Sequence, residues 1–270
     1  MHSLSTKPKK SLGQNFLANQ GICKRAIETA NIQRDDIIVE VGPGKGALTF
    51  LLAQKAKQVI AVEKDKELAQ ALVKMLKDKN INNVEIVKDD ILKYRVASFK
   101  QEYKVVANLP YNIATAVIMK FLTAENRPEA MAVMLQKEVG QRMTAKPPKM
   151  SRLAVFSQLY SEIKIAFYIK KENFYPKPKV DSALLLIKPF AEKELKKRLK
   201  NLDIFTKIVR AGFSQPRKQL LNNLTWGLSL EKPAVENWLK ENNSDPKQRP
   251  ETLTVEDWLN LTKSSSVLGT

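Results

Sequence analysis

One stretch near the start of the chain limits the possible folds more than any other. The β-branched residues of Ile37–Val41 predict a buried strand. A Gly-Pro-Gly-Lys-Gly loop follows at residues 42–46, and residues 47–56 have the apolar spacing of a helix. Glycines in such a loop let the backbone approach a ligand closely. This order of strand, loop and helix predicts an α/β fold whose open parallel sheet binds a nucleotide-like cofactor.

An acidic residue at the end of the next predicted strand fits the same cofactor site. Glu63 follows the strand Val59–Val62, about 20 residues beyond the first glycine, which is the spacing of a carboxylate that binds ribose hydroxyls. The loop itself does not choose between NAD and S-adenosylmethionine, because Ala47 can replace the third glycine of a dinucleotide loop. It is not a phosphate-binding Walker loop, because Gly46 stands where Ser or Thr would follow Gly-Lys.

Strands and helices continue to alternate through the middle of the chain. Asp89 and Asp90 follow the third strand, where a carboxylate can accept a hydrogen bond from an adenine amine or cap a helix. Of the two, Asp90 is the favoured cofactor ligand. The remaining predicted strands cover residues 84–87, 105–107, 130–135, 163–169 and 183–187, and the predicted helices cover 65–79, 113–122, 137–144 and 152–160.

A short loop after the fourth strand carries the second strong signal. Residues 108–111 are Asn-Leu-Pro-Tyr. Pro110 keeps Leu109 extended and has no N–H group, so the turn is rich in acceptors, including the Asn108 amide oxygen. Tyr111 adds a flat aromatic face. This combination suits a planar base that bears an exocyclic amine, whereas the simpler interpretation is a strand-to-helix turn with a core tyrosine.

The sequence divides into three predicted parts. Residues 1–18 form a basic arm, which is either disordered or closes over a ligand, with Asn15 as a polar contact and Phe16 as an apolar lid. Residues 19–190 form the cofactor-binding domain, and residues 191–270 form a small all-α domain.

Short helices with tryptophan and leucine neighbours dominate the predicted helical domain. Trp226, Trp238 and Trp258 are expected to be core anchors there. Ser214–Lys218 is a basic helix entry that suits a phosphate group. Thr254 and Asp257 are spaced as a capping box for the last helix.

The charge balance favours a polyanionic partner such as nucleic acid or an anionic membrane surface. The chain has 46 Lys and Arg against 28 Asp and Glu, a formal net charge of +18. No stretch is long and apolar enough to span a bilayer, and no apolar segment of a signal peptide follows the basic start. One Cys and one His cannot make a Cys/His zinc site, so no metal is expected, and a lone Cys suits the cytoplasm.

The motifs taken together resemble the ribosomal RNA adenine N6-dimethyltransferases, the KsgA family. The resemblance covers most of the chain and rests on six stretches in order: residues 13–17, 40–46, 108–112, 135–138, 174–183 and 213–218. The sequence departs from the family's usual pattern at Met150-Ser151, in place of Tyr-Gly, and at Tyr175, in place of Pro or Thr.

The resemblance implies a Rossmann-like methyltransferase sheet, S-adenosylmethionine as methyl donor and a small helical domain. The implied substrate is a pair of adjacent adenosines in the 3′-terminal hairpin of 16S rRNA, within the 30S subunit or its precursor, and the enzyme is expected to be a cytoplasmic monomer. The implied cofactor residues are Asn15, Leu17, Gly42, Gly44, Glu63, Asp90 and Asn108. The implied catalytic residues are Asn108, Leu109, Pro110 and Tyr111, with Tyr111 and Phe174 stacking on the base. Apart from the resemblance, the basic residues Lys9, Lys10, Arg217 and Lys218 are expected to contact the RNA backbone.

Four alternatives remain open at this point. A 23S rRNA adenine methylase of the macrolide-resistance type shares the Gln-Asn-Phe-Leu and Asn-aliphatic-Pro-Tyr motifs. A DNA adenine methylase is disfavoured because no target-reading domain is evident. An NAD-dependent oxidoreductase fits the glycine loop but has no catalytic His, and a non-catalytic RNA-binding factor would retain the pocket.

Overall fold

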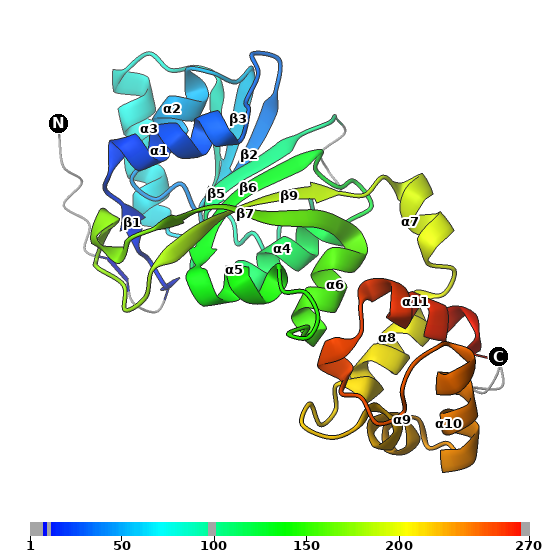
Figure 1. The fold of residues 1–270 in the computed structure, drawn as a ribbon. Helices are drawn as coiled ribbons and strands as arrows, with labels where there is room; N and C mark the ends of the chain where they lie inside the picture. The colour runs from blue at the N-terminus through cyan, green and yellow to red at the C-terminus, as the bar shows by residue number, and fades with distance from the viewer. Residues whose placement is uncertain (1–7, 10–11, 97–100, 266–270) are drawn as a thin grey trace. The chain divides into compact units, whose positions relative to one another are not determined.

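The computed structural model describes residues 8–9, 12–96 and 101–265, which fall into two compact units. The first unit lies within Met1–Gln141 and Glu162–Pro189, and the second within Arg142–Ser161 and Phe190–Thr270. Figure 1 shows the sheet of the first unit and the helices of the second. In the part of the chain that is described, no helix is long and apolar enough to cross a membrane.

The first unit is built on a seven-stranded sheet with the order β4-β3-β2-β5-β6-β9-β7. The strands from β4 to β6 are parallel, and β9 is antiparallel to β6. Their bounds are Ile37–Val41 for β2, Gln58–Val62 for β3, Val84–Val87 for β4, Lys104–Asn108 for β5, Ala130–Gln136 for β6, Ser161–Ile169 for β7 and Ser182–Pro189 for β9. The predicted parallel sheet is confirmed, and its β2 and β5 lie side by side, which brings the glycine loop next to the Asn-Leu-Pro-Tyr turn.

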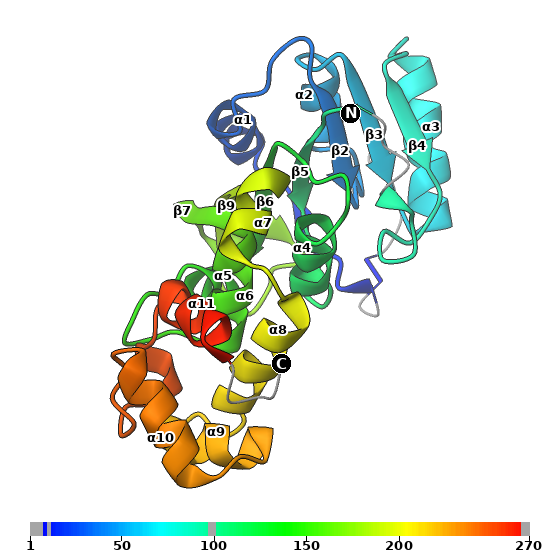
Figure 2. The ribbon, with the colours of Figure 1, turned by 90° about the vertical axis from the view of Figure 1, so that its right-hand side faces the viewer.

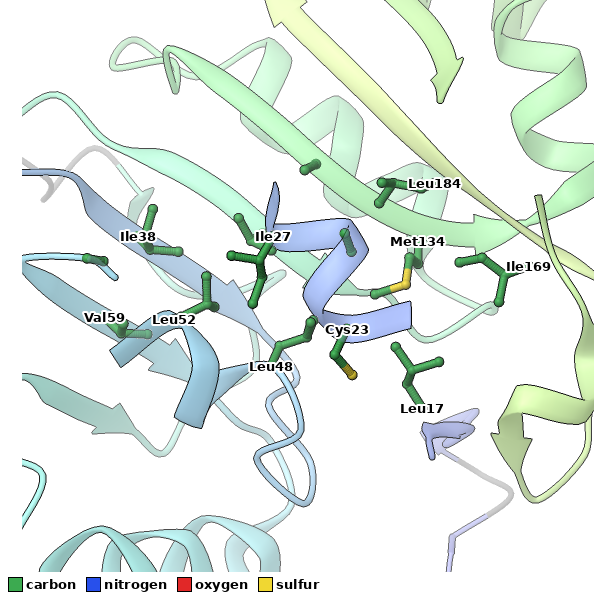
Figure 3. Packing of buried hydrophobic residues seen from close by; sticks show 14 of the residues in the cluster. Leu17, Cys23, Ile27, Ile38, Leu48, Leu52, Val59, Met134, Ile169 and Leu184 are labelled. Atoms are coloured by element: carbon green, nitrogen blue, oxygen red, sulfur yellow. The ribbon is translucent and has the colours of Figure 1, made fainter. Parts of the chain in front are cut away.

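Helices pack on both faces of this sheet. Their bounds are Gln20–Thr29 for α1, Thr49–Ala53 for α2, Lys66–Asp78 for α3, Ala114–Leu122 for α4 and Lys137–Met143 for α5. One face forms a core with α1 and α2, in which Ile27 and Leu52 lie against Ile38 and Met134 (Figure 3). Strand side chains alternate between faces, and the fully buried Val105 and Val133 point to the opposite face. In Figure 1, α1 lies in front of the sheet and α4 behind it.

The arm contains a short strand that sequence patterning did not predict. β1 (Phe16–Leu17) pairs antiparallel with β8 (Phe174–Tyr175), so that Phe16 lies opposite Tyr175 and Leu17 opposite Phe174. The 3-10 turn η3 (Lys171–Asn173) leads into β8. This pairing fixes the end of the arm beside the glycine loop of the same unit.

The second unit is helical, as predicted, with α6 through α11 visible in Figure 2. Trp238 and Trp258 are 2% and 0% exposed, which confirms them as core residues, but Trp226 is 82% exposed and that prediction is wrong. The predicted capping box of Thr254 and Asp257 is present. The bounds are Arg152–Tyr160 for α6, Glu192–Arg198 for α7, Leu202–Gly212 for α8, Leu220–Leu228 for α9, Lys232–Glu241 for α10, Pro250–Thr252 for the 3-10 turn η4 and Val255–Lys263 for α11.

The division between the units differs from the single boundary expected near residue 190. Residues 142–161, which include α6, belong with the C-terminal helices. The reason is packing: the Phe156 ring meets the Phe205 ring edge-on at 5.9 Å, and the Met150 N–H donates to the Glu251 carbonyl at 3.0 Å. These contacts join residues far apart in sequence, and no local pattern reveals them.

Candidate active site

A hollow lies at the carboxyl ends of the parallel strands in the first unit, where open α/β sheets bind ligands. It encloses about 840 Å³, a volume that includes the open solvent at its mouth. Its lining includes most of the residues that the sequence predicted as cofactor ligands: Asn15, Gly42, Gly44, Glu63, Asp90 and Asn108, with Leu109 and Pro110. Leu17 instead lines an adjoining hollow, which also touches Gly42, Asn108 and Phe16.

The glycine loop adopts the backbone conformation that its sequence requires. Gly42 and Gly44 have φ values of +64° and +57°, in the left-handed region that side chains disfavour. A Cβ at Gly44 would also lie 2.9 Å from the Phe16 ring. The loop and the arm therefore approach each other closely only because residue 44 has no side chain.

Glu63 is held rigidly at the end of β3. Its carboxylate accepts from the Gly44 N–H at 3.0 Å and from the Asp65 N–H at 2.8 Å, and it is only 6% exposed. Burial raises the pKa of Glu63, and these two N–H donors oppose that rise. A buried carboxylate fixed in this way presents its remaining lone pairs to the hollow as hydrogen-bond acceptors.

Asp90 is a second acceptor in the same hollow. Its carboxylate contacts the Lys64 ammonium at 2.9 Å and accepts from the Leu92 N–H at 3.0 Å. The Lys64 contact is the main cause of a lowered pKa for Asp90. The carboxylate is therefore ionised at neutral pH and suited to an amine donor. Asp89 also lines the hollow, but its oxygen accepts from the backbone N–H of Asp90.

The Asn-Leu-Pro-Tyr turn begins where β5 ends. The Asn108 amide nitrogen donates to the Asn15 carbonyl at 2.8 Å, so the arm fixes the orientation of the amide and leaves its oxygen free to accept elsewhere. The Leu109 N–H donates to the Met134 carbonyl at 3.0 Å, and the Pro110 carbonyl accepts from the Ile113 N–H at 3.1 Å. These bonds hold the turn to β6 and to the start of α4.

The two predicted stacking residues lie in different environments. Tyr111 is half-buried, and its hydroxyl is 2.7 Å from the Ser182 hydroxyl, which anchors the ring. Phe174 is 3% exposed and belongs to the hydrophobic core with Leu17. In this conformation it presents no face to a base, and its stacking role stays a prediction. Its neighbour Tyr175 is 63% exposed and lines the adjoining hollow together with Asn108.

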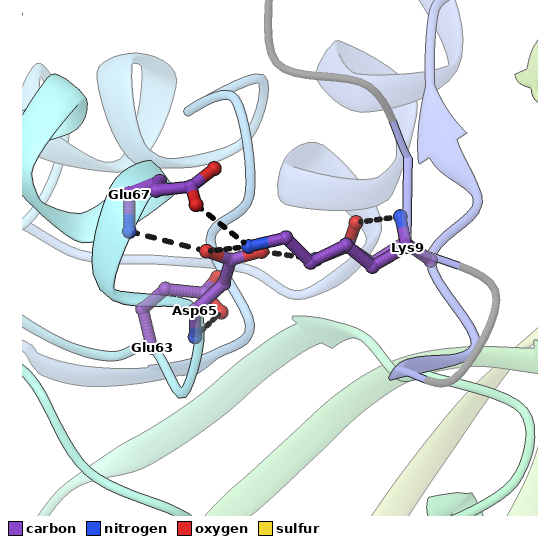
Figure 4. Close-up of polar contacts among 5 residues, drawn as sticks. Lys9, Glu63, Asp65 and Glu67 are labelled. Carbon is purple, nitrogen blue, oxygen red and sulfur yellow. Dashed lines mark hydrogen bonds and ion pairs between the residues drawn. The ribbon is translucent and has the colours of Figure 1, made fainter.

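The basic residues predicted to contact RNA also lie in different environments. Lys9 lies 3.0 Å from Asp65 and 3.3 Å from Glu67 (Figure 4), so its ammonium group ties the arm to the start of α3. Gln14 reinforces this contact, donating to Asp65 at 3.1 Å. Arg217 and Lys218 are exposed in the second unit, and Lys10 is outside the described residues.

Glu40 is a candidate site residue that the sequence reasoning missed. It is 1% exposed, it lines the adjoining hollow, and its Oε2 atom has no hydrogen-bond partner among the described residues. Burial raises the pKa of Glu40 to about 8, and the nearby charge of Glu63 acts in the same direction. The sequence feature that could have identified Glu40 is an acidic residue inside the otherwise apolar run Ile37–Val41.

The donors and acceptors present fit S-adenosylmethionine. Glu63 suits ribose hydroxyls, and Asp90 suits an adenine amine. Among the described residues, no cluster of His, Cys, Asp or Glu could hold a metal ion.

Comparisons with known proteins identify the family of this chain. A family model described as "Ribosomal RNA adenine dimethylase" matches residues 5–266. Proteins named "Ribosomal RNA small subunit methyltransferase A" are similar to this chain. The protein from Dehalococcoides mccartyi (strain CBDB1) is 39% identical over 264 residues, covering 97% of this chain and 89% of that protein. The protein from Enterococcus faecalis is 39% identical over 269 residues, covering 95% of this chain and 90% of that protein.

Two solved structures share the fold over nearly the whole chain. The crystal structure of a dimethyladenosine transferase from Plasmodium falciparum gives a TM-score of 0.79 at 26% identity, covering 94% of this chain and 98% of that one. The crystal structure of the 23S rRNA methyltransferase ErmE gives a TM-score of 0.72 at 26% identity, covering 92% of this chain and 98% of that one. The full-length match excludes the oxidoreductase alternative, and the chain belongs to the ribosomal RNA adenine dimethylase family, whose methyl donor is S-adenosylmethionine.

Proposed function

We propose that this enzyme transfers methyl groups to the N6 amines of two adjacent adenosines in the 3′-terminal hairpin of 16S rRNA, during maturation of the small subunit. The small-subunit methyltransferases that are 39% identical over nearly the full chain support this target. The observation that carries the chemistry is the Asn108 amide, whose nitrogen is bound to the Asn15 carbonyl at 2.8 Å and whose oxygen is thereby left for a substrate amine. We place the reaction in the cytoplasm and expect a monomer.

The proposed chemistry depends on placing the amine. S-Adenosylmethionine, when bound, supplies an electrophilic methyl group. An adenine amine is a poor nucleophile, because its lone pair is delocalised into the ring. The Asn108 amide oxygen accepts one amine hydrogen and the Leu109 carbonyl accepts the other, since the Pro110 carbonyl already accepts from Ile113. Holding both hydrogens localises the lone pair, so positioning and electrostatics lower the barrier without a strong base.

The base itself must leave its stack to reach this turn. Tyr111 offers the flat face on which an extruded adenine stacks, and the hydrogen bond to Ser182 keeps that ring in place. Loop and end bases unstack at low cost, so a hairpin loop is a suitable target. The first transfer leaves one hydrogen on the amine, since the other is lost as a proton, so the second methyl transfer requires the monomethylated amine to rotate and to be held again through this hydrogen by one of the two acceptors.

The experiment is a labelled-methyl transfer assay on immature 30S particles, free 16S rRNA, free 23S rRNA and duplex DNA in parallel. We expect methylation of the 30S particles or of 16S rRNA, and nucleoside mass analysis should show N6,N6-dimethyladenosine. Preferential labelling of 23S rRNA would favour the macrolide-resistance type of activity, to which the similarity with ErmE points. No transfer to any of the four substrates would contradict the proposal.

A further inference from the structure

The cofactor hollow and the adjoining hollow of the first unit follow the same segments of the chain. The arm contributes residues 12–16 to the cofactor hollow and residues 16–18 to the adjoining one. Phe16, Gly42 and Asn108 line both hollows. The two hollows are therefore neighbouring parts of one binding region between the arm and the glycine loop.

The shape of S-adenosylmethionine matches a region of two parts. The molecule is elongated, with adenine and ribose at one end, an α-amino acid at the other and the sulfonium between them. The acceptors that suit adenine and ribose, Asp90 and Glu63, line the cofactor hollow and not the adjoining one. Leu17, which the resemblance implied as a cofactor residue, lines the adjoining hollow. The adjoining hollow is thus the part of the region that suits the amino-acid end.

The adjoining hollow has a positive charge that suits the carboxylate of this amino acid. Among the described residues that line it, Lys45 is the only cationic one. Its ammonium nitrogen lies 5.3 Å from the centroid of the Phe16 ring, which borders both hollows. Lys64 lines the cofactor hollow, but its ammonium group pairs with Asp90 at 2.9 Å. Burial raises the pKa of Glu40 in the adjoining hollow to about 8, so this acid is neutral at pH 7 and does not repel an anion.

The glycine loop fixes the backbone that carries Lys45. The Gly46 N–H donates to the Pro43 carbonyl at 2.9 Å, which closes a turn around Lys45. The Gly44 N–H donates to the Glu63 carboxylate at 3.0 Å. The loop that carries the cation is therefore tied to the acid that suits the ribose. A group on a fixed backbone loses less freedom when it binds a ligand, which favours affinity.

We propose that Lys45 binds the α-carboxylate of S-adenosylmethionine in the adjoining hollow. An ammonium group and a carboxylate form a charge-assisted hydrogen bond, which is about twice as strong as a neutral one. This contact fixes the end of the cofactor that lies opposite the adenine, and so helps to place the sulfonium beside Asn108, which lines both hollows. The inference concerns the cofactor alone and does not depend on which RNA is methylated.

The test compares S-adenosylmethionine with decarboxylated S-adenosylmethionine, which keeps the nucleoside, the sulfonium and the amine and lacks only the carboxylate. Calorimetry measures the Kd of both compounds for the parent and for Lys45→Met. We expect the substitution to raise the Kd for S-adenosylmethionine about tenfold, as the loss of a hydrogen bond to a charged group does. The Kd for the decarboxylated compound should not rise, because that compound has no group for Lys45 to bind.

Two further variants serve as references. Lys45→Arg keeps the positive charge and should retain most of the preference of the parent for the carboxylated compound. Lys55→Met is the matched control, because Lys55 is an exposed lysine that follows the same loop in the chain, and it should bind both compounds as the parent does.

The ratio of the two Kd values separates a contact with the carboxylate from a structural role of Lys45. A distorted loop weakens the binding of both compounds alike and leaves the ratio at its parent value. An unchanged ratio in Lys45→Met would therefore overturn the inference, and so would equal binding of the two compounds by the parent. Lys45→Gln, measured in parallel, removes the charge with a polar side chain and provides the same ratio if Lys45→Met does not fold. The measurement uses no RNA, so its result is independent of whether 16S rRNA is the substrate.

Discussion

At the residue scale, the proposed role of Tyr111 in stacking on the base can be tested separately from cofactor binding. Its ring is anchored by Ser182 and does not line the cofactor hollow. We expect Tyr111→Ala to lower kcat/KM for RNA by about ten- to a hundredfold, since stacking contributes about 1–3 kcal/mol per base. The Kd for S-adenosylmethionine, measured by calorimetry, should stay within a factor of about two.

The matched control is Tyr111→Phe, which keeps the ring and removes only the hydroxyl that contacts Ser182. It should retain most of the transfer rate. If Tyr111→Ala weakened cofactor binding as much as methyl transfer, Tyr111 would be a core residue rather than a platform for the base. Asn108 is different, because it lines both hollows and its loss should impair cofactor binding and transfer together.

The buried Glu40 carboxyl leads to a prediction about how the free energy of unfolding depends on pH. Its folded-state pKa is raised to about 8 by burial, whereas an unfolded glutamate titrates near 4.3. Between these values the folded state holds a proton that the unfolded state has lost. The contribution of Glu40 to the free energy of unfolding therefore falls as pH rises through this window, by roughly 1.4 kcal/mol per pH unit.

Urea unfolding of the parent and of Glu40→Gln at pH 5, 6, 7 and 8 measures this effect. The isosteric amide cannot ionise, so the stability advantage of Glu40→Gln over the parent should grow with pH and level off above about pH 8. The difference between the two proteins removes the contribution of other titrating groups. A difference that does not change across the four pH values would show that Glu40 is already ionised in the folded enzyme.

At the element scale, the pairing of β1 with β8 couples the arm to the site. Lys9 and Gln14 bind Asp65, the N-cap residue of α3, and Asn15 binds Asn108. Burial raises the pKa of Asp65, but the hydrogen bonds from Lys9 and Gln14 outweigh it, and the net pKa is lowered. The arm is thus held by an ionised carboxylate at a helix N-terminus, where negative charge is favourable.

Lys9→Gln should therefore loosen the arm. Surface ion pairs contribute little individually, so we expect a modest rise in the Kd for S-adenosylmethionine, about two- to fivefold. Amide hydrogen exchange at Phe16 and Leu17 should become faster. Lys24→Gln removes an exposed lysine of α1 and serves as the control. Unchanged exchange at β1 in Lys9→Gln would mean that strand pairing alone holds the arm.

The two residues of β8 should respond differently to substitution, because side chains of a strand alternate in direction. Phe174 points into the core and Tyr175 into solvent beside Asn108. Phe174→Ala should destabilise the fold by about 3–5 kcal/mol, as buried phenylalanine substitutions do. Tyr175→Ala should leave stability unchanged, as measured by urea unfolding. The opposite ranking of stabilities would show that the core conformation of Phe174 is not the resting state.

Local patterns predicted the parts of this fold that depend on local physics. The run Ile37–Val41 and its glycine loop were predicted because apolar strands and positive φ angles leave clear signals in sequence. The β1–β8 pairing was not predicted, because two-residue strands have no periodicity. Trp226 was misassigned since its leucine neighbours are buried and spacing alone does not show which way one side chain points. The grouping of α6 with α8 and α11 depends on contacts distant in sequence, such as that of Phe156 with Phe205.

At the scale of the whole molecule, we expect the net charge to determine how the affinity for RNA depends on salt. A formal charge of +18 means that binding a polyanion displaces condensed counterions, and the affinity then falls steeply with salt. Neutralising even three phosphates of a single strand gives a slope of about −2 in log K against log salt. Raising the salt from about 50 to 200 mM should therefore weaken binding to 16S rRNA by at least about tenfold.

The cofactor provides the internal control for this measurement. S-Adenosylmethionine is small and binds inside a hollow lined by apolar groups and by fixed carboxylates such as Glu63, so its Kd should change by less than about twofold over the same salt range. Parallel titrations of rRNA by filter binding and of cofactor by calorimetry test both statements. A salt-insensitive Kd for rRNA would mean that base contacts at Tyr111 and the Asn108 turn dominate the affinity. The surplus of lysine and arginine would then act on the rate of encounter rather than on the stability of the complex.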